Sequence, residues 1–195
     1  MNGQIWWYTA RSGGILAWLL LAASVLWGLA MTTKAAGRIT RPAWLLDLHR
    51  FLGAAALVFT GIHVLAILLD SFVHFGLVEV LVPLTGTWHP VAVAWGIVGL
   101  YLLAAIEVTS LVRTRLPQRV WRGVHYASFP LFVVTTIHGL SAGTDRHSPL
   151  MLWGTIAICA MVAALTALRV ISATSPQPRA AAPRPPWPAM PSRRP

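Results

Sequence analysis

Five long hydrophobic runs dominate the sequence, and short segments that carry most of the charged residues separate them. The runs occupy residues 15–31, 51–69, 91–108, 121–140 and 150–168. Each is near the length of about 20 residues, with a range of about 17–25, that an α-helix needs to cross a bilayer. The pattern predicts an all-α integral membrane bundle of five transmembrane helices, in which the second helix begins near Leu45.

The basic residues are distributed unevenly between the two ends of these helices. Thirteen of the fifteen lysines and arginines fall in residues 32–50, in residues 109–123 or from Arg169 onward. The remaining two are Arg11 and Arg146. Because Lys and Arg accumulate on the cytoplasmic side of membrane proteins, this distribution predicts an N-terminus outside and a C-terminus inside. It also favours a retained first helix over a cleaved signal peptide.

Two segments differ from plain connections. Residues 70–90 contain no Lys or Arg and are rich in apolar residues, which predicts a short interfacial helix between the second and third transmembrane helices. Residues 176–195 hold eight prolines and four arginines and little that could be buried. We therefore divide the chain into a transmembrane domain, residues 1–172, and a disordered Pro/Arg-rich cytoplasmic tail, residues 173–195.

The composition supports a lipid environment. Charged residues make up 10% of the chain and hydrophobic residues 56%, whereas about 25% of a typical soluble domain is charged. The net charge of +10 does not predict nucleic-acid binding, because the charges lie in short segments between apolar runs. The single cysteine, Cys159, excludes an internal disulfide, an iron–sulfur cluster and a Cys-x-x-Cys-His haem attachment. Tryptophans are expected at both interfaces, with Trp44 and Trp121 at the inner one.

Four of the seven histidines lie in predicted transmembrane helices. His49 and His63 are on the second helix, fourteen residues apart, and His125 and His138 are on the fourth, thirteen apart. Ionisable or polar side chains are costly inside a membrane, so each of these is a candidate functional residue. A single histidine could simply join two helices by a hydrogen bond, but two on each of two helices favour a shared function. We interpret the other three as polar surface residues: His74, His89 and His147.

The spacing of these four histidines predicts two levels within the membrane. At 1.5 Å per residue, the two separations correspond to about 21 Å and about 19.5 Å along the helices. Both helices are expected to run from inside to outside, so His49 and His125 lie at the inner level and His63 and His138 at the outer level. Two opposed imidazoles at one depth are what a six-coordinate haem iron needs.

The second helix agrees with this geometry. At about 100° per residue, His49 and His63 differ by only about 40° around the helix and share a face. Gly53, Ala56 and Thr60 lie between them on that face. These small side chains either leave room for flat macrocycles or allow close helix packing, and the spacing alone does not separate the two interpretations.

The fourth helix does not give the same alignment. On an ideal helix, His125 and His138 lie about 140° apart. Pro130 stands between them and is expected to kink the helix or break its register.

These residues resemble those of a known family. The histidine spacing resembles the ferric reductase-like transmembrane domain, which iron reductases share with the membrane core of NADPH oxidases and with the haem subunit of bacterial periplasmic methionine-sulfoxide reductase systems. Residues 47–53 (DLHRFLG), 121–126 (WRGVHY) and 137–145 (IHGLSAGTD) look like the stand-alone bacterial members. The resemblance extends over roughly residues 10–172.

The resemblance implies two b-type haems. The first histidine of each helix would hold the inner haem, so His49 and His125 bind one iron, and His63 and His138 bind the other. Members of the family with flavin and nicotinamide domains usually have six helices. This chain shows five, with no Gly-x-Gly-x-x-Gly turn and a tail too short for a nucleotide-binding domain. We therefore expect no FAD or NAD(P) site here.

The expected function is electron transfer across a bacterial inner or plasma membrane. The donor would be a quinol or a cytoplasmic flavoprotein, and the acceptor would lie outside. The chain would be an oxidoreductase component with lipid as its surroundings and no nucleic-acid partner. The alternatives are a haem subunit that serves a separate exported oxidoreductase, a non-haem metal transporter, and an assembly protein whose histidines only join helices.

Overall fold

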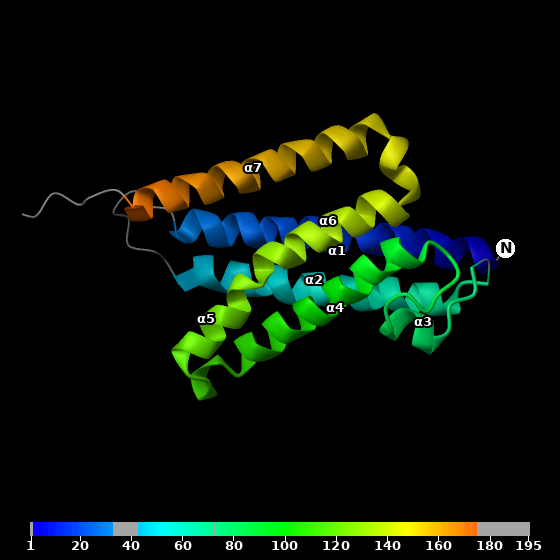
Figure 1. Ribbon diagram of the computed structural model, residues 1–195, viewed down its shortest axis with the longest axis horizontal. Helices are drawn as coiled ribbons and strands as arrows, with labels where there is room; N and C mark the ends of the chain where they lie inside the picture. Colours follow the sequence, from blue (N-terminus) through cyan, green and yellow to red (C-terminus); the bar gives the residue numbers. More distant parts are fainter. Residues whose placement is uncertain (1, 33–42, 72, 175–195) are drawn as a thin grey trace, which may run out of the picture.

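The structure is a computed structural model that describes residues 2–32, 43–71 and 73–174 (Figure 1). Within these ranges every regular element is helical, which confirms the all-α prediction. The elements are α1 (Asn2–Thr32), α2 (Ala43–Leu69), α3 (Leu77–Leu81), α4 (Pro90–Leu111), η2 (Arg113–Arg115), α5 (Gln118–Tyr126), α6 (Ser128–Ala142), η3 (Thr144–His147) and α7 (Pro149–Thr174). The predicted tail lies outside the described residues from position 175 onward.

Four helices in the described part of the chain are long and apolar enough to cross a membrane: Gln4–Thr32 within α1, and the whole of α2, α4 and α7. The first of them differs from the prediction at its start. Helix α1 begins at Asn2, so Arg11 lies within the helix and does not precede it. Arg11 is accommodated there because its guanidinium forms an ion pair with Asp145 of η3.

The fourth predicted span, residues 121–140, is not one continuous helix. It consists of α5 and α6, which meet at Ala127. The break lies where Pro130 requires it, because a proline removes the hydrogen bond to the carbonyl four residues earlier and its ring clashes with that carbonyl, here that of Tyr126. Ala127 instead donates to the carbonyl of Val124, three residues back, and Leu131 resumes the regular pattern by donating to Ala127.

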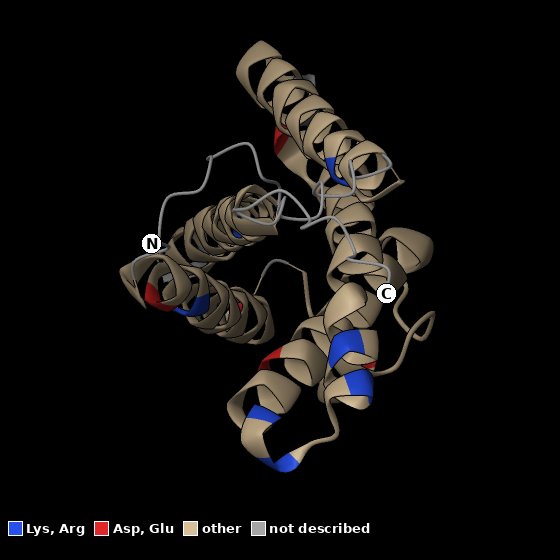
Figure 2. Ribbon diagram, turned by 90° about the vertical axis from the view of Figure 1, so that its left-hand side faces the viewer, with Lys and Arg blue, Asp and Glu red and all other residues tan. Residues whose placement is uncertain are grey.

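Successive helices run in opposite directions when α5 and α6 are counted together: α1, α4 and α7 run one way, and α2 and α5–α6 run the other (Figure 1). The end of α1, the start of α2, the turn from η2 into α5 and the end of α7 lie at one end of the molecule (Figure 1). The N-terminus, α3 and η3 lie at the other. Figure 2 looks at the first end and shows basic residues gathered where η2 and α5 lie. The orientation of these ends in a bilayer, and the interfacial position of α3, stay predictions.

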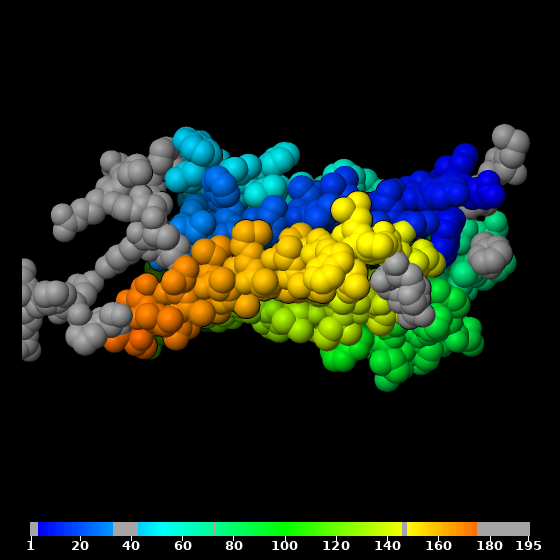
Figure 3. Space-filling model, turned by 90° about the horizontal axis from the view of Figure 1, so that it is seen from above, coloured from blue at the N-terminus to red at the C-terminus, as the bar shows by residue number. Residues whose placement is uncertain are grey.

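The helices form two closely packed pairs, α1 with α2 and α4 with α6. Helix α7 packs against α1 and covers it on one side (Figure 3). Tryptophan side chains join the helices: Trp18 Nε1 donates to Thr136 Oγ1 of α6 at 2.9 Å, and Trp27 Nε1 donates to the carbonyl of Leu45 in α2 at 3.0 Å. The buried core lies where α1, α2, α4, α6 and α7 meet, and it consists of Leu21, Ala22, Val25, Leu29, Ala56, Leu103, Ile106, Leu131, Phe132 and Val162.

Candidate site: two pairs of facing histidines

The structure brings the four membrane histidines together as two facing pairs. The ring centres of His49 and His125 are 6.0 Å apart, and those of His63 and His138 are 6.3 Å apart. In both pairs the ring planes meet at 77°. We call His49 and His125 the inner pair and His63 and His138 the outer pair, after their predicted positions.

Three of the four imidazoles are fixed through Nδ1 by a backbone carbonyl of the neighbouring helix. His63 Nδ1 lies 2.6 Å from the carbonyl oxygen of Ala10, and His138 Nδ1 lies 2.8 Å from that of Ala92. His49 Nδ1 lies 3.1 Å from the carbonyl oxygen of Ser24. A carbonyl oxygen can only accept, so each Nδ1 carries the proton and the lone pair is on Nε2. For His49 this assignment makes the hydroxyl of Ser24, 3.2 Å from Nδ1, a second acceptor. These rings therefore hold the tautomer that binds a metal through Nε2.

A glycine lies against each of these three rings. A β-carbon at Gly14 would lie 2.9 Å from Nδ1 and 3.0 Å from Cε1 of His63. A β-carbon at Gly96 would lie 2.7 Å from Cε1 of His138, and one at Gly28 would lie 3.2 Å from Cε1 of His49. Any larger residue at Gly14 or Gly96 would push the imidazole away.

At each of the three fixed rings, the carbonyl that accepts from Nδ1 and the glycine beside the ring lie on the same helix, four residues apart. In an α-helix, the carbonyl of residue i points toward residue i+4, so a missing side chain at i+4 leaves that oxygen open to a second donor. We call this arrangement a carbonyl–glycine cradle. It occurs three times, as Ala10 with Gly14, Ser24 with Gly28 and Ala92 with Gly96.

His125 is the exception. Its Nδ1 is buried and has no hydrogen-bond partner among the described residues. The ring instead stacks on Trp121, one turn earlier in α5, with ring centres 5.0 Å apart and planes at 20°. The guanidinium of Arg113 lies over the same indole, 5.1 Å from its centre. Trp121 was expected only as an interfacial residue, so its contact with a candidate ligand is a finding of the structure.

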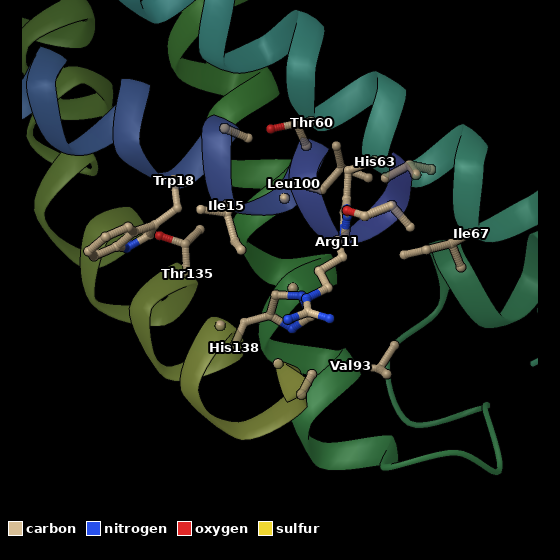
Figure 4. A pocket seen from close by; sticks show the side chains of 18 of the residues that line it. Arg11, Ile15, Trp18, Thr60, His63, Ile67, Val93, Leu100, Thr135 and His138 are labelled. Carbon is tan, nitrogen blue, oxygen red and sulfur yellow. The ribbon is translucent and has the colours of Figure 1, made fainter. Parts of the chain in front are cut away.

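A cavity of about 260 Å³ opens beside the outer pair. Figure 4 shows His63 of α2 and His138 of α6 reaching it from different helices, with the side chain of Arg11 next to them. Thr60 and Trp18 also line it, and the lining is mostly apolar. A cavity of this size is near the lower end of the usual range for small-molecule sites, about 300–1,000 Å³.

A layer of aliphatic side chains separates the two pairs. Leu21 lies midway between the glycines of the two α1 cradles, and Ala56 lies midway between His49 and His63. Ala56 is fully buried, and Leu131, between His125 and His138, is 1% exposed. The pairs are therefore two sites on either side of a dry core.

The facing rings could hold a metal ion only if other groups complete its coordination. Imidazole nitrogens lie about 2.0–2.1 Å from a bound first-row metal ion, so two rings on one ion have nitrogens about 4 Å apart and ring centres somewhat farther. The observed separations of 6.0 and 6.3 Å fit this arrangement. Among the residues that the structure describes, no cluster of three or more His, Cys, Asp or Glu residues could complete such a site. The donor set fits a macrocycle that supplies the remaining ligands.

A comparison with known families agrees with these features. A family model described as "Ferric reductase like transmembrane component" matches residues 13–136, more than half of the chain. The chain belongs to the ferric reductase-like transmembrane family. The matched residues include three of the four histidines and end two residues before His138. Together with four membrane-length helices, this membership makes the chain a multi-pass membrane protein. No curated protein and no solved structure matches it.

Other polar residues of this ferric reductase-like protein lie outside the two pairs. Tyr101 donates from its hydroxyl to the carbonyl of Leu81 at 2.6 Å and ties α4 to the end of α3. Glu107 lies against α2, where a β-carbon at Gly53 would be 2.5 Å from its Oε1. His74 and His89 are exposed. The side chain of His147 is not among those that the structure describes.

The cradle residues were missed from the sequence, although a signal for two of them was present. Gly14 and Gly28 are separated by fourteen residues, the same spacing as His49 and His63. Two antiparallel helices that pack closely meet at matching intervals, so equal spacings on consecutive helices indicate contact at two levels. The three small residues on α2 were expected either to make room for macrocycles or to allow close helix packing. Thr60 lines the cavity, whereas Ala56 is in the core and Gly53 faces Glu107.

Proposed function

We propose that this ferric reductase-like protein carries electrons across the membrane through two b-type haems. His49 and His125 hold one haem, and His63 and His138 hold the other. The observation that carries the proposal is the arrangement of imidazoles as two facing pairs, with ring centres 6.0 and 6.3 Å apart. Membership of the ferric reductase-like family supports it independently.

The tautomers of the histidines support ligation. Hydrogen bonds to the carbonyls of Ala10, Ser24 and Ala92 keep the proton on Nδ1 of three rings. Such bonds orient a metal-binding imidazole and make it a stronger ligand. A histidine that only joined two helices would need no free Nε2 and no glycine beside its ring.

The chain and the cofactor have separate parts in this function. When bound, haem iron supplies a centre that takes up and releases one electron. The imidazoles fix the depth of the two centres, since fourteen residues of helix correspond to about 21 Å. The aliphatic layer around Leu131 and Ala56 excludes water between them.

The basic end of the molecule is the proposed entry side for electrons. Arg113 and Arg115 of η2 and Arg119 and Arg122 of α5 lie there, near the inner pair. A quinol in the bilayer or a cytoplasmic flavoprotein is the proposed donor, and an exported oxidoreductase is the proposed acceptor at the outer pair. The chain acts as a component of an oxidoreductase system.

The proposal is tested by counting haems on the purified protein. The full chain is extracted in detergent from membranes grown with haem available, and a pyridine haemochrome assay is combined with a dithionite-reduced minus oxidised spectrum. Bis-histidine ligation at both pairs gives about two b haems per chain. A content of one haem per chain would keep the proposed electron transfer but restrict haem binding to a single pair. Protein without haem would overturn the proposal in favour of metal transport or assembly.

A further inference from the structure

The four imidazoles are not held equally. A carbonyl–glycine cradle fixes His49, His63 and His138, whereas His125 has no hydrogen-bond partner for its buried Nδ1. The outer pair therefore consists of two fixed rings, and the inner pair of one fixed ring and one that is held only by stacking on Trp121.

The helix that carries His125 is also weakly packed. Helix α5 has nine residues and no buried residue, and it is separated from α6 by the break at Ala127. A β-carbon at Gly123, two residues before His125, would meet nothing within 4 Å. His138 lies instead on α6, whose Leu131 and Phe132 are in the core. On α5 only partly buried side chains reach the core, Val124 among them, so the backbone at His125 is held less tightly than the backbone at His138.

The unpaired Nδ1 favours such a movement. A buried N–H without an acceptor is destabilised relative to one that reaches water or a polar group. In its inward position, the ring of His125 has such a buried Nδ1 without an acceptor. Rotation of the ring toward the exposed side of α5 would bring this nitrogen to water and remove the cost. The cradled rings would lose a hydrogen bond by the same movement.

We propose that the inner pair is an exchangeable-ligand site, at which a small neutral diatomic molecule replaces His125, and that the outer pair is closed to such ligands. This inference rests on the proposed function. If the inner pair holds haem as proposed, His125 would give up its bond from Nε2 to the reduced iron, and the lone pair of the incoming molecule would form the new bond. No electron is transferred, no proton moves, and His125 stays neutral.

Carbon monoxide is the probe that tests this inference. The haem content of the full chain is measured first, and the dithionite-reduced protein is then titrated with carbon monoxide while the difference spectrum is recorded. We expect about half of the haem to bind carbon monoxide, since one of two pairs exchanges its ligand. Two haems that both resist carbon monoxide overturn the inference and leave the proposed function standing, whereas absence of haem overturns the proposed function itself.

Two variants identify the reactive pair. His63→Ala removes the outer haem, which is checked as a fall in haem content from about two to about one per chain. The bound fraction of the remaining haem then rises from about one half to about one if the inner pair is reactive. A fall to zero would assign the reaction to the outer pair and overturn the inference.

Gly96→Ala gives a second readout, because its β-carbon displaces His138 and opens the outer pair to carbon monoxide. The control is Gly154→Ala on α7, whose β-carbon meets nothing within 4 Å and which keeps the fraction near one half. An unchanged fraction in Gly96→Ala would contradict the assignment.

Discussion

The inner and outer pairs have nearly the same geometry but are supported differently. Ring separations of 6.0 and 6.3 Å and identical interplanar angles make them look equivalent. Their surroundings differ, because the outer pair has two cradles and lies on helices packed into the core, whereas the inner pair has one cradle and uses the short helix α5. Similar ring positions therefore do not imply equal rigidity, which depends on the backbone of the adjacent helix.

The cradles show where that rigidity comes from. Each fixed imidazole donates to a carbonyl that a glycine four residues later leaves uncovered. The neighbouring helix, and not the helix that carries the histidine, sets the ring orientation. Helix α1 supports both levels through Ala10 with Gly14 and Ser24 with Gly28, so it belongs to the site although it contributes no candidate ligand.

The largest expected effect comes from removing one ring of a pair. His63→Ala should reduce haem content from about two to about one per chain, with loss of the outer signal only. His49→Ala is the matched variant and should remove the inner signal instead. Haem quantification and electron paramagnetic resonance of the oxidised protein distinguish the two. Unchanged haem content in His63→Ala would contradict the assignment of the outer pair.

A substitution in the layer between the pairs should affect both of them. Leu131→Ala leaves a cavity in the core and is expected to lower the free energy of unfolding by about 2–5 kcal/mol. Thermal unfolding in detergent measures this change. Leu150→Ala serves as the control, because that side chain is 85% exposed and its loss should have little effect. Selective weakening of a single pair in Leu131→Ala would show that the layer is not shared.

A smaller and pair-specific effect is expected from filling a cradle. Gly14→Ala places a β-carbon 2.9 Å from Nδ1 of His63 and weakens its hydrogen bond to Ala10. A net hydrogen bond contributes about 1 kcal/mol, so affinity for the outer haem should fall about fivefold. Gly61→Ala is the control, since its β-carbon meets nothing within 4 Å. Titration of haem into the apoprotein compares them, and equal losses in both variants would argue against the cradle.

The smallest effect is expected from the ion pairs at the two ends. Arg11 pairs with Asp145 near the outer cavity, and Arg50 pairs with Asp47 near the inner pair. Both pairs are partly or largely exposed, so Asp145→Asn and Asp47→Asn should each cost less than about 1 kcal/mol. Asp145 is the less exposed carboxylate, at 21% against 67%, and its substitution should have the larger effect. Unfolding at low and high salt measures both, and a larger effect for Asp47→Asn would reverse the order.

Much of this arrangement could be predicted from sequence because it depends on composition and spacing. The apolar runs predict membrane helices, and four of them have the required length in the structure. The separation of His49 from His63 predicts two levels on one helix face. The family assignment from the histidine spacing is confirmed by the match over residues 13–136. Haem binding, the orientation in the bilayer and a fifth span stay predictions.

Other features depend on tertiary geometry that a one-dimensional pattern does not contain. An ideal helix leaves His125 and His138 about 140° apart, and only the break at Ala127 lets both face α2. Pro130 indicated a break, but its angle depends on how α5 and α6 pack. The cradles require knowledge of which α1 carbonyl meets which ring, and this is set by the contact of α1 with α2.

The aliphatic layer around Leu131 and Ala56 has an electrical consequence. If the two pairs hold haems as proposed, the layer places hydrocarbon between two redox levels, and its residues Leu21, Ala56 and Leu131 carry no group that could pass on a proton. Each electron that crosses this layer would therefore leave uncompensated charge behind. Transport through this protein would polarise the membrane, and the membrane potential would in turn oppose or assist every further transfer.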